Sequence, residues 1–309
     1  MGKATRESYG MALVELGREN QKIVVLDADL SKSTKTNGFK KEFKDRFFNV
    51  GIAEQNLMGM AAGFANVGNI PFASTFAVFA AGRAFEVVRN SICYPKMNVK
   101  IAATHAGITV GEDGGSHQSV EDIALMSSLP NMTVIVPADH KEAMAATKAA
   151  AEFQGPVYLR FGRCGTEDIF DENYEFKIGK GVELRRGNDI SIIATGMMVS
   201  KAIEASKELE SQGIGARVIN ISTIKPIDRE IILKAAMETK GIVTAEEHSI
   251  IGGLGAMVSE VVCSQCPTIV RRVGIKDVFG ESGTPKELME KYKLTSEAIR
   301  EEAKLILNN

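Results

Sequence analysis

Hydrophobic positions along this chain follow two spacings that alternate with each other. Near the amino terminus they recur every three or four residues, as on one helix face, at Tyr9, Ala12, Leu13 and Leu16. An unbroken apolar run at 23–26 follows, which is typical of a strand buried on both faces of a parallel sheet. The alternation predicts strands at 48–50, 70–75, 98–104, 133–136 and 157–159, and helices at 57–64, 76–92, 120 onward and 141–152.

The alternation returns in the second half of the chain after a break. Residues 165–188 are charged and of short period, which indicates a linker with room for a hairpin. Beyond them, strands at 190–194, 216–221, 242–245 and 268–273 alternate with helices at 199–212, 228–239, 254–263 and after 285. The predicted fold class is therefore α/β, with two doubly wound parallel-sheet domains in series at 1–164 and 189–309.

The composition excludes several classes of function. The 309 residues are 44% hydrophobic and 25% charged, and the formal net charge is −2. A nearly neutral chain has no general attraction to nucleic acid or to an acidic membrane, so an anionic ligand must meet a few local basic residues. No apolar run is long enough to span a bilayer, and the amino terminus lacks an apolar signal core. We expect a cytoplasmic protein.

The four cysteines are too few to form a disulfide framework in a chain of this size. Cys263 and Cys266 form a C-x-x-C pair, which in other settings is a redox site or half of a zinc site. No second pair follows, and this pair ends a helix-like run rather than opening one. We therefore expect neither metal binding nor redox chemistry at this pair.

Glu54 stands at a predicted junction between a strand and a helix. The strand at 48–50 turns at Gly51, and helical spacing continues through Leu57 and Met60. In one interpretation Glu54 only complements the positive end of the helix dipole. In the other, apolar residues on both sides hinder ionisation, so that the acid keeps or shares a proton. The local pattern leaves both interpretations open.

A glycine-rich polar loop covers 105–119 and contains two of the four histidines. Its glycines permit close approach of the backbone to a ligand, and its polarity is not expected of a core element. His105, Asp113 and His117 would then anchor a hydroxylated or phosphorylated substrate. With Glu112 they would alternatively form a metal site, although histidines twelve residues apart match no compact metal spacing. A solvated loop without function is the third interpretation.

Three other residues also have two interpretations. Arg163, after the strand at 157–159, would bind a phosphate or form a surface ion pair. Phe76 and Phe79 lie three apart on one predicted helix face, which is typical of core residues. The same aromatic pair would also form a wall for a flat heterocycle. The chain contains no P-loop and no G-x-G-x-x-G dinucleotide motif.

Several short motifs together resemble one enzyme family. They are 50–56 (VGIAEQN), 74–76 (STF), 104–105 (TH), 111–118 (GEDGGSHQ) and 130–132 (PNM), with looser similarity at 246–248 (EEH) and 279–282 (FGES). These motifs are similar to those of the thiamine diphosphate-dependent transketolase family. The chain resembles its carboxy-terminal half, which holds the pyrimidine-binding and carboxy-terminal domains. The GEDGGSHQ loop is quite specific, whereas the motif around Glu54 is shared with related families.

The resemblance implies contacts to thiamine diphosphate. Glu54 would hydrogen-bond a ring nitrogen of the aminopyrimidine and promote its imino tautomer, which then removes the thiazolium C2 proton. Phe76 and Phe79 would line the pyrimidine pocket, and Asp29 would lie near the thiazolium. Gly82 departs from the family, because full-length transketolases usually have a tyrosine there.

The resemblance also implies contacts to a phosphorylated sugar. His117 would bond hydroxyls near the carbonyl of the ketose donor and would act in catalysis together with Glu54. Asp113 would recognise the configuration of a neighbouring hydroxyl. Ser33, His105 and Arg163 would hold the distant phosphate.

The resemblance further implies a partner chain. No G-D-G…N segment, which holds the pyrophosphate through Mg²⁺ in this family, is present. The Mg²⁺ ligands would belong to an N-terminal transketolase subunit, in a heterotetramer with self-dimerisation, and this chain alone would be inactive. Together the two chains would transfer a two-carbon ketol unit from a ketose phosphate to an aldose phosphate.

Other functions remain as alternatives. Within the cofactor class they are a split transketolase for an acid- or sulfonate-bearing sugar, a deoxyxylulose phosphate synthase, or the beta subunit of a 2-oxoacid dehydrogenase. The Ser-His-Gln sequence of the loop argues against the last two, since those families differ there. Outside that class, the chain would be a non-catalytic binding subunit or a metal hydrolase that uses the histidine loop.

Overall fold

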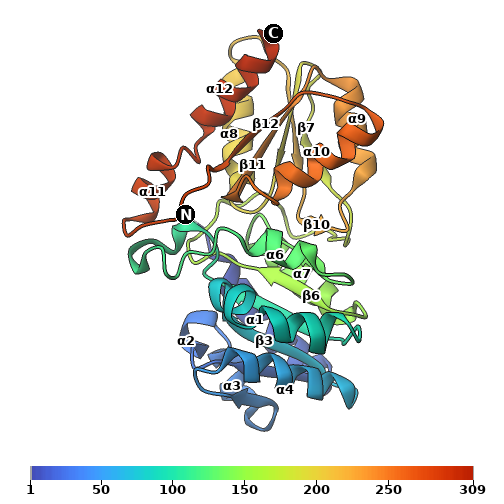
Figure 1. Cartoon of the computed structure of the whole chain (residues 1–309), viewed down its shortest axis with the longest axis vertical. Coiled ribbons are helices and arrows are strands. Elements are labelled where there is room, and N and C mark those ends of the chain that lie inside the picture. The colour runs from blue at the N-terminus through green and yellow to red at the C-terminus, as the bar shows by residue number, and fades with distance from the viewer. Residues whose placement is uncertain (1, 309) are drawn as a thin grey trace.

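The structure is a computed structural model that describes residues 2–308, and it confirms two parallel-sheet α/β domains (Figure 1). The first sheet has seven strands in the order β10-β5-β6-β4-β3-β1-β2, and only β10 runs antiparallel to its neighbour. Its strands are β1 (Ile23–Asp27), β2 (Phe47–Asn49), β3 (Ile70–Phe76), β4 (Lys100–Thr104), β5 (Thr133–Ile135), β6 (Val157–Arg160) and β10 (Thr223–Lys225).

Helices cover both faces of this sheet. Helices α1 and α7 pack against each other on one face, and α4 lies on the other face with the helical segment that follows β3. The helices are α1 (Thr5–Glu19), α2 (Ser31–Thr34), α3 (Asn37–Glu42), η1 (Lys44–Arg46), α4 (Glu54–Asn66), η2 (Phe79–Arg83), α5 (Phe85–Val87), η3 (Val88–Cys93), η4 (Ile108–Asp113), α6 (Asp122–Ser128) and α7 (His140–Glu152).

The second sheet has five strands in the order β12-β11-β8-β9-β7. Its strands are β7 (Val182–Arg185), β8 (Ile190–Ala194), β9 (Ala216–Asn220), β11 (Ile242–Ser249) and β12 (Val270–Ile275). Its helices are α8 (Met198–Glu210), α9 (Arg229–Glu238), α10 (Leu254–Gln265), α11 (Pro285–Lys291) and α12 (Ser296–Leu307). Cys263 lies within α10 and Cys266 lies directly after it, and both are free thiols.

Strand β1 illustrates why unbroken apolar runs become central strands. Ile23 and Val25 pack into the cluster under α1 and α7, whereas Val24 and Leu26 pack into the cluster under α4. Successive side chains of a strand point to opposite faces, so a sheet covered on both faces needs apolar residues at every position. All five residues of β1 are buried.

Two short strands cross the predicted domain boundaries. β10 lies at 223–225, inside the sequence of the second domain, but pairs antiparallel with β5 at the edge of the first sheet. β7 lies inside the predicted linker 165–188, and it pairs antiparallel with β9 of the second sheet rather than forming a local hairpin. The domains are therefore joined by backbone hydrogen bonds as well as by the connecting chain.

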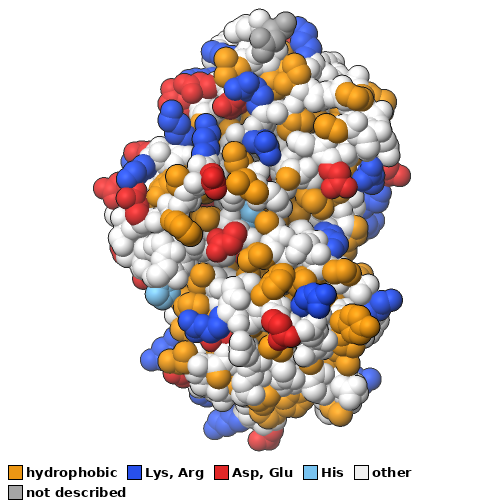
Figure 2. Space-filling view, viewed as in Figure 1, with side chains coloured by type: hydrophobic (Ala, Val, Ile, Leu, Met, Phe, Trp, Pro, Cys, Tyr) orange, Lys and Arg blue, Asp and Glu red, His pale blue; other side chains and the backbone are white. Residues whose placement is uncertain are grey.

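The surface is electrically mixed. On the face in Figure 2, acidic and basic side chains are interspersed among hydrophobic ones and form no single basic patch. Within residues 2–308, no helix combines the length and the apolar character needed to cross a membrane.

Candidate active site

The predicted site residues follow the carboxyl ends of the parallel strands of the first sheet, where α/β sheets bind ligands. Asp29 follows β1 and Glu54 follows β2, after a turn at Gly51 with a φ of +74°. Phe76 is the last residue of β3, and His105 comes directly after β4. Arg163 follows β6 by three positions. Residues far apart in the sequence are thus brought to one edge of the sheet.

Glu54 is the first residue of α4, and its side chain is only 2% exposed. Its carboxylate accepts a hydrogen bond of 2.9 Å from the Arg83 guanidinium, which itself is half exposed. The apolar neighbours in the sequence therefore do not describe the whole setting of Glu54, because a guanidinium also contacts it. Arg83 is 29 residues away in the sequence, on the helical segment that follows β3, so the pattern around Glu54 could not reveal it.

Four rings form an aromatic cluster next to this ion pair. Phe76 stacks on the imidazole of His105, with ring centroids 3.9 Å apart, and on Phe79 at 5.8 Å. His117 contacts Phe79 edge-on, at 5.6 Å between centroids. The Arg83 guanidinium also lies over the ring of Phe79, at 4.5 Å from its centroid. Phe76 and Phe79 therefore stack on each other, and the pair contacts both histidines.

The segment after β3 was predicted as one regular helix at 76–92, but it is wound differently. Between Phe79 and Arg83 and again between Val88 and Cys93 the turns are wide, with hydrogen bonds from residue i+5 to residue i. Such turns are rare and recur at functional sites. Here the wide turn brings Arg83 back over the ring of Phe79.

His105 is a neutral hydrogen-bonding group rather than a cation. Its side chain is 3% exposed, and burial, followed by the charges of Arg6 and Arg163, lowers its pKa to about 3. Arg6 can only donate, so the Nε2 atom of His105, 3.1 Å from Arg6 Nη1, accepts. The Nδ1 atom then bears the proton and donates to Thr104 Oγ1 at 2.9 Å.

Arg6 is a further candidate site residue, which the sequence reasoning missed. Its Nη1 atom also donates to the backbone oxygen of Ser33 at 2.9 Å, and so it joins Ser33 to His105. The charges of Arg6, Arg163 and Lys35 all lower the pKa of His105, which places three cations around it. A signal was present, because Arg6 lies in the first turn of α1, where the helix dipole disfavours a positive charge.

Arg163 is paired with the glycine-rich loop. Its Nη1 atom bonds the backbone oxygen of Val110 and lies 3.5 Å from Glu112 and 3.7 Å from Asp113. Arg163 therefore forms ion pairs here, as in one of the two interpretations. To bind a phosphate it would have to leave these acids. Asp29 is exposed and bonds with Asn49, and among residues 2–308 it makes no hydrogen bond to another candidate residue.

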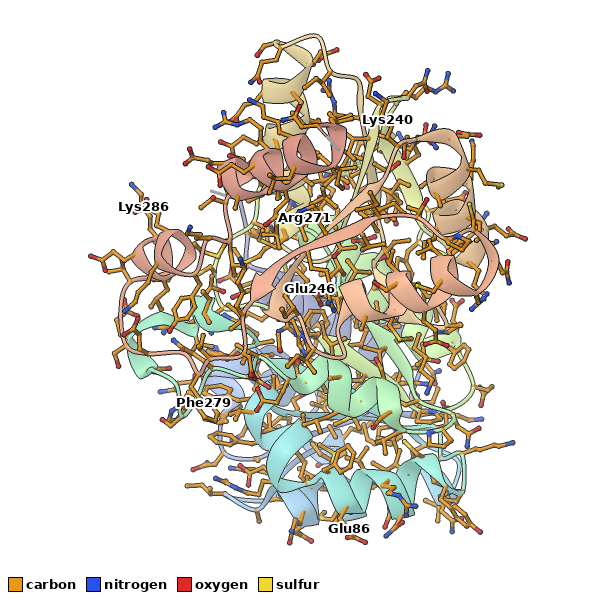
Figure 3. The ribbon with its side chains drawn as sticks, turned by 45° about the horizontal axis from the view of Figure 1, so that its top comes forward. Glu86, Lys240, Glu246, Arg271, Phe279 and Lys286 are labelled. Carbon is orange, nitrogen blue, oxygen red and sulfur yellow. The ribbon has the colours of Figure 1, made fainter. Side chains whose placement is uncertain are left out.

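The second domain holds the glycine-rich loop in place. The backbone N–H of Thr109 donates to Glu247 at 2.7 Å, and the Gln118 amide donates to the backbone oxygen of Glu281 at 2.9 Å. Gly107 has a φ of +81°, and a Cβ there would lie 2.2 Å from the carboxylate of Glu247. In Figure 3, Glu246, the neighbour of Glu247, lies where the ribbons of the two domains meet.

The loop is consequently more buried than predicted. Ile108 and Val110 are fully buried, and Ile108 packs into the core of the second domain. The prediction that this loop is no core element is wrong for its first half, because the second domain covers it. Asp113 stays exposed and His117 half-buried. Within 2–308 no group of three or more His, Cys, Asp or Glu side chains is arranged to hold a metal ion, so the metal-site interpretation gains no support.

Comparison with known protein families accounts for both domains. Residues 1–166 match the family described as transketolase, pyrimidine binding domain, and residues 179–299 match the transketolase C-terminal domain. The chain belongs to the transketolase family. The resemblance inferred from the motifs is thereby confirmed, and thiamine diphosphate is the cofactor of that family.

The most informative relatives of this transketolase chain match almost its whole length. A putative transketolase C-terminal section of Methanocaldococcus jannaschii is 53% identical over 300 residues, which covers 96% of this chain and 94% of that protein. A 6-deoxy-6-sulfo-D-fructose transketolase subunit of a Clostridium species is 43% identical over 95% of this chain and 91% of its own. A solved structure described as a split gene transketolase, inactive beta4 tetramer, is 59% identical, with a TM-score of 0.94 and 99% coverage of both chains.

Proposed function

We propose that this chain is one subunit of a two-chain transketolase that transfers a two-carbon ketol unit from a ketose phosphate to an aldose phosphate. The observation that carries the proposal is the continuity of the site. The ion pair of Glu54 and Arg83 touches Phe79, the aromatic cluster continues to His105, and Arg6 and Arg163 surround that histidine. One cofactor and one sugar phosphate would use all of these groups.

The residues present fit the aminopyrimidine of thiamine diphosphate. The Arg83 guanidinium, a planar hydrogen-bond donor, already lies over Phe79 and donates to Glu54, and a flat aminopyrimidine would use the same two contacts. Phe79 and Phe76 would hold the ring, Glu54 would share a proton at its ring nitrogen, and Asp29 would lie near the thiazolium. When bound, the cofactor supplies the electron sink for breaking and making the carbon–carbon bond.

The sugar would lie between His117 and the cations around His105. His117 and Asp113 would bond its hydroxyls near the reacting carbon. Arg6, Arg163 and Ser33 would hold its phosphate, with Arg163 exchanging Glu112 for the ligand. His105, which is neutral, would contribute a hydrogen bond and not a charge. Holding the distant phosphate fixes the carbonyl in register for attack.

The rest of the site would come from an N-terminal transketolase subunit that carries the pyrophosphate and Mg²⁺ ligands. The absence of a G-D-G…N segment from this sequence supports such a partner. So do the names of two relatives, one a transketolase subunit and one a split gene transketolase in an inactive beta4 tetramer. We propose a heterotetramer that contains a dimer of this chain. The similarity to a sulfosugar transketolase subunit keeps a sulfonated ketose as a second candidate donor.

Reconstitution tests the proposal. This chain, an N-terminal subunit, thiamine diphosphate and Mg²⁺ are mixed, and transfer from a ketose phosphate to an aldose phosphate is followed with and without each component. Activity that requires both chains and the cofactor is expected. Activity of this chain alone, or metal-dependent activity without thiamine diphosphate, would refute it. A parallel series with a sulfonated ketose shows which donor the site accepts.

A further inference from the structure

Arg83 has an unusual position for a half-exposed side chain. Its guanidinium lies 4.5 Å from the centroid of Phe79 and donates at 2.9 Å to Glu54, which is 2% exposed. Among residues 2–308, Arg83 is the hydrogen-bond partner of the Glu54 side chain. Arg83 therefore occupies both contacts that the proposed function assigns to the cofactor's aminopyrimidine.

We infer that Arg83 is a competing group, which fills the aminopyrimidine site of the cofactor-free chain and leaves it when the cofactor binds. This inference rests on the proposed function. A guanidinium and an aminopyrimidine are both planar, and both would hydrogen-bond the Glu54 carboxyl group. Arg83 does so by donating to the carboxylate, and the aminopyrimidine would do so through the ring nitrogen at which Glu54 shares a proton, so each occupies Glu54 and covers Phe79. The two cannot be there at once, because they use the same carboxylate and the same aromatic face.

The surroundings allow Arg83 to move while Glu54 stays. Arg83 is half exposed and lies on the wide turn of η2, next to Gly82. A Cβ added at Gly82 would meet no atom within 4 Å, so open space lies next to Gly82, where related enzymes usually have a tyrosine. Glu54, in contrast, is fixed by its buried position at the start of α4.

The competition has a thermodynamic consequence. Without Arg83, the cofactor-free chain would hold a buried carboxylate with no cationic partner, which is destabilising, although less so than for a fully buried pair because Arg83 is half exposed. The cofactor-bound state would lose nothing, because Arg83 makes neither contact there. By linkage, a substitution that destabilises only the cofactor-free state must tighten cofactor binding by the same factor. Arg83 thus stabilises the cofactor-free chain and weakens its affinity for the cofactor.

The test uses Arg83→Met, which keeps an apolar stem and removes the guanidinium. Binding of thiamine diphosphate with Mg²⁺ to the reconstituted two-chain complex is measured by calorimetry, and Tm is measured with and without saturating cofactor. We expect the Kd to fall about tenfold, equivalent to about 1.4 kcal/mol. We also expect the Tm to fall only without cofactor. Arg89→Met is the matched control, since Arg89 is exposed on the same helical segment and, among residues 2–308, its side chain bonds Asn90 alone.

The other outcomes are decisive. If Arg83→Met binds the cofactor more weakly, Arg83 contributes to the bound site, in place of the missing tyrosine, and the inference is wrong. An unchanged Kd also overturns it, because the guanidinium then does not compete. If the wild-type complex binds no thiamine diphosphate, the proposed function fails and the inference fails with it. A wild-type complex that binds normally therefore separates the two failures.

Discussion

Removal of the Glu247 carboxylate should impair sugar turnover without affecting the cofactor, although Glu247 belongs to the second domain. In Glu247→Ala, the buried N–H of Thr109 loses its 2.7 Å acceptor, and the space beside Gly107 is left unfilled. An orphaned buried donor costs about 1–3 kcal/mol. The loop that carries Asp113 and His117 is then free to shift, and a shift of about 1 Å in a positioned group can cost about a hundredfold in rate.

The assay measures kcat and KM for the ketose donor in the reconstituted complex, together with the Kd for thiamine diphosphate. We expect kcat/KM to fall ten- to a hundredfold, by analogy with such shifts, while the Kd stays the same. Glu247→Gln should recover most of the loss, because an amide oxygen still accepts from Thr109.

Glu246→Ala is the matched control. Glu246 is also buried but accepts from the backbone N–H groups of Leu254 and Gly255, at 2.6 and 2.9 Å, and so it caps α10 within the second domain. This variant should lose stability yet keep its donor KM. Equal losses of kcat/KM in the alanine variants of Glu246 and Glu247 would show that general destabilisation, and not the position of the loop, is responsible.

Two further predictions concern the phosphate end of the site. The pKa of His105 is lowered to about 3 by burial, so its stabilising contribution is complete above the ordinary value of 6.5 and is lost as the pH falls through that range. Between pH 6.5 and 5 the wild type should lose about 1.6 kcal/mol relative to His105→Gln in denaturant unfolding, and parallel curves would contradict this. Arg6→Gln should raise the KM for a phosphorylated donor at least tenfold, through loss of a charge-assisted contact of about 1.5–3 kcal/mol, but not that for an unphosphorylated ketose. Arg18→Gln, on the exposed side of the same helix, should change neither KM, and equal effects of Arg6→Gln on both donors would refute a phosphate contact.

The elements with strong periodicity were predictable, because their burial is determined locally. The run at 23–26 and the face of α1 each identify the side that packs, and the structure buries both. The strands β7 and β10 were not predicted. Each is short, and β10 has only the three residues Thr-Ile-Lys. Its pairing with β5 depends on how the second domain packs against the first, and a local sequence pattern does not predict that.

The candidate site residues could be predicted where the residue type is unusual for its position. They could not be predicted where their setting depends on residues distant in the sequence. Histidines in a glycine-rich loop and an acid at a helix start are visible in the sequence. The burial of Ile108 was not, because it results from packing against the second domain, and neither was the pairing of Glu54 with Arg83. Arg6 was overlooked for a different reason. One cation in the first turn of a helix is a weak signal until His105 is found beside it.

Exchange of the C2 proton of thiamine diphosphate for deuterium tests the central claim most directly. The exchange rate is followed by NMR for this chain alone, for the reconstituted two-chain complex, and for the complex with Glu54→Gln, all with Mg²⁺. We predict acceleration only in the wild-type complex, and a rate at least about a hundredfold lower with Glu54→Gln, as for loss of a positioned acid. Equal rates in the wild-type and Glu54→Gln complexes, or full acceleration by this chain alone, would contradict the proposed role of Glu54 in a shared active site.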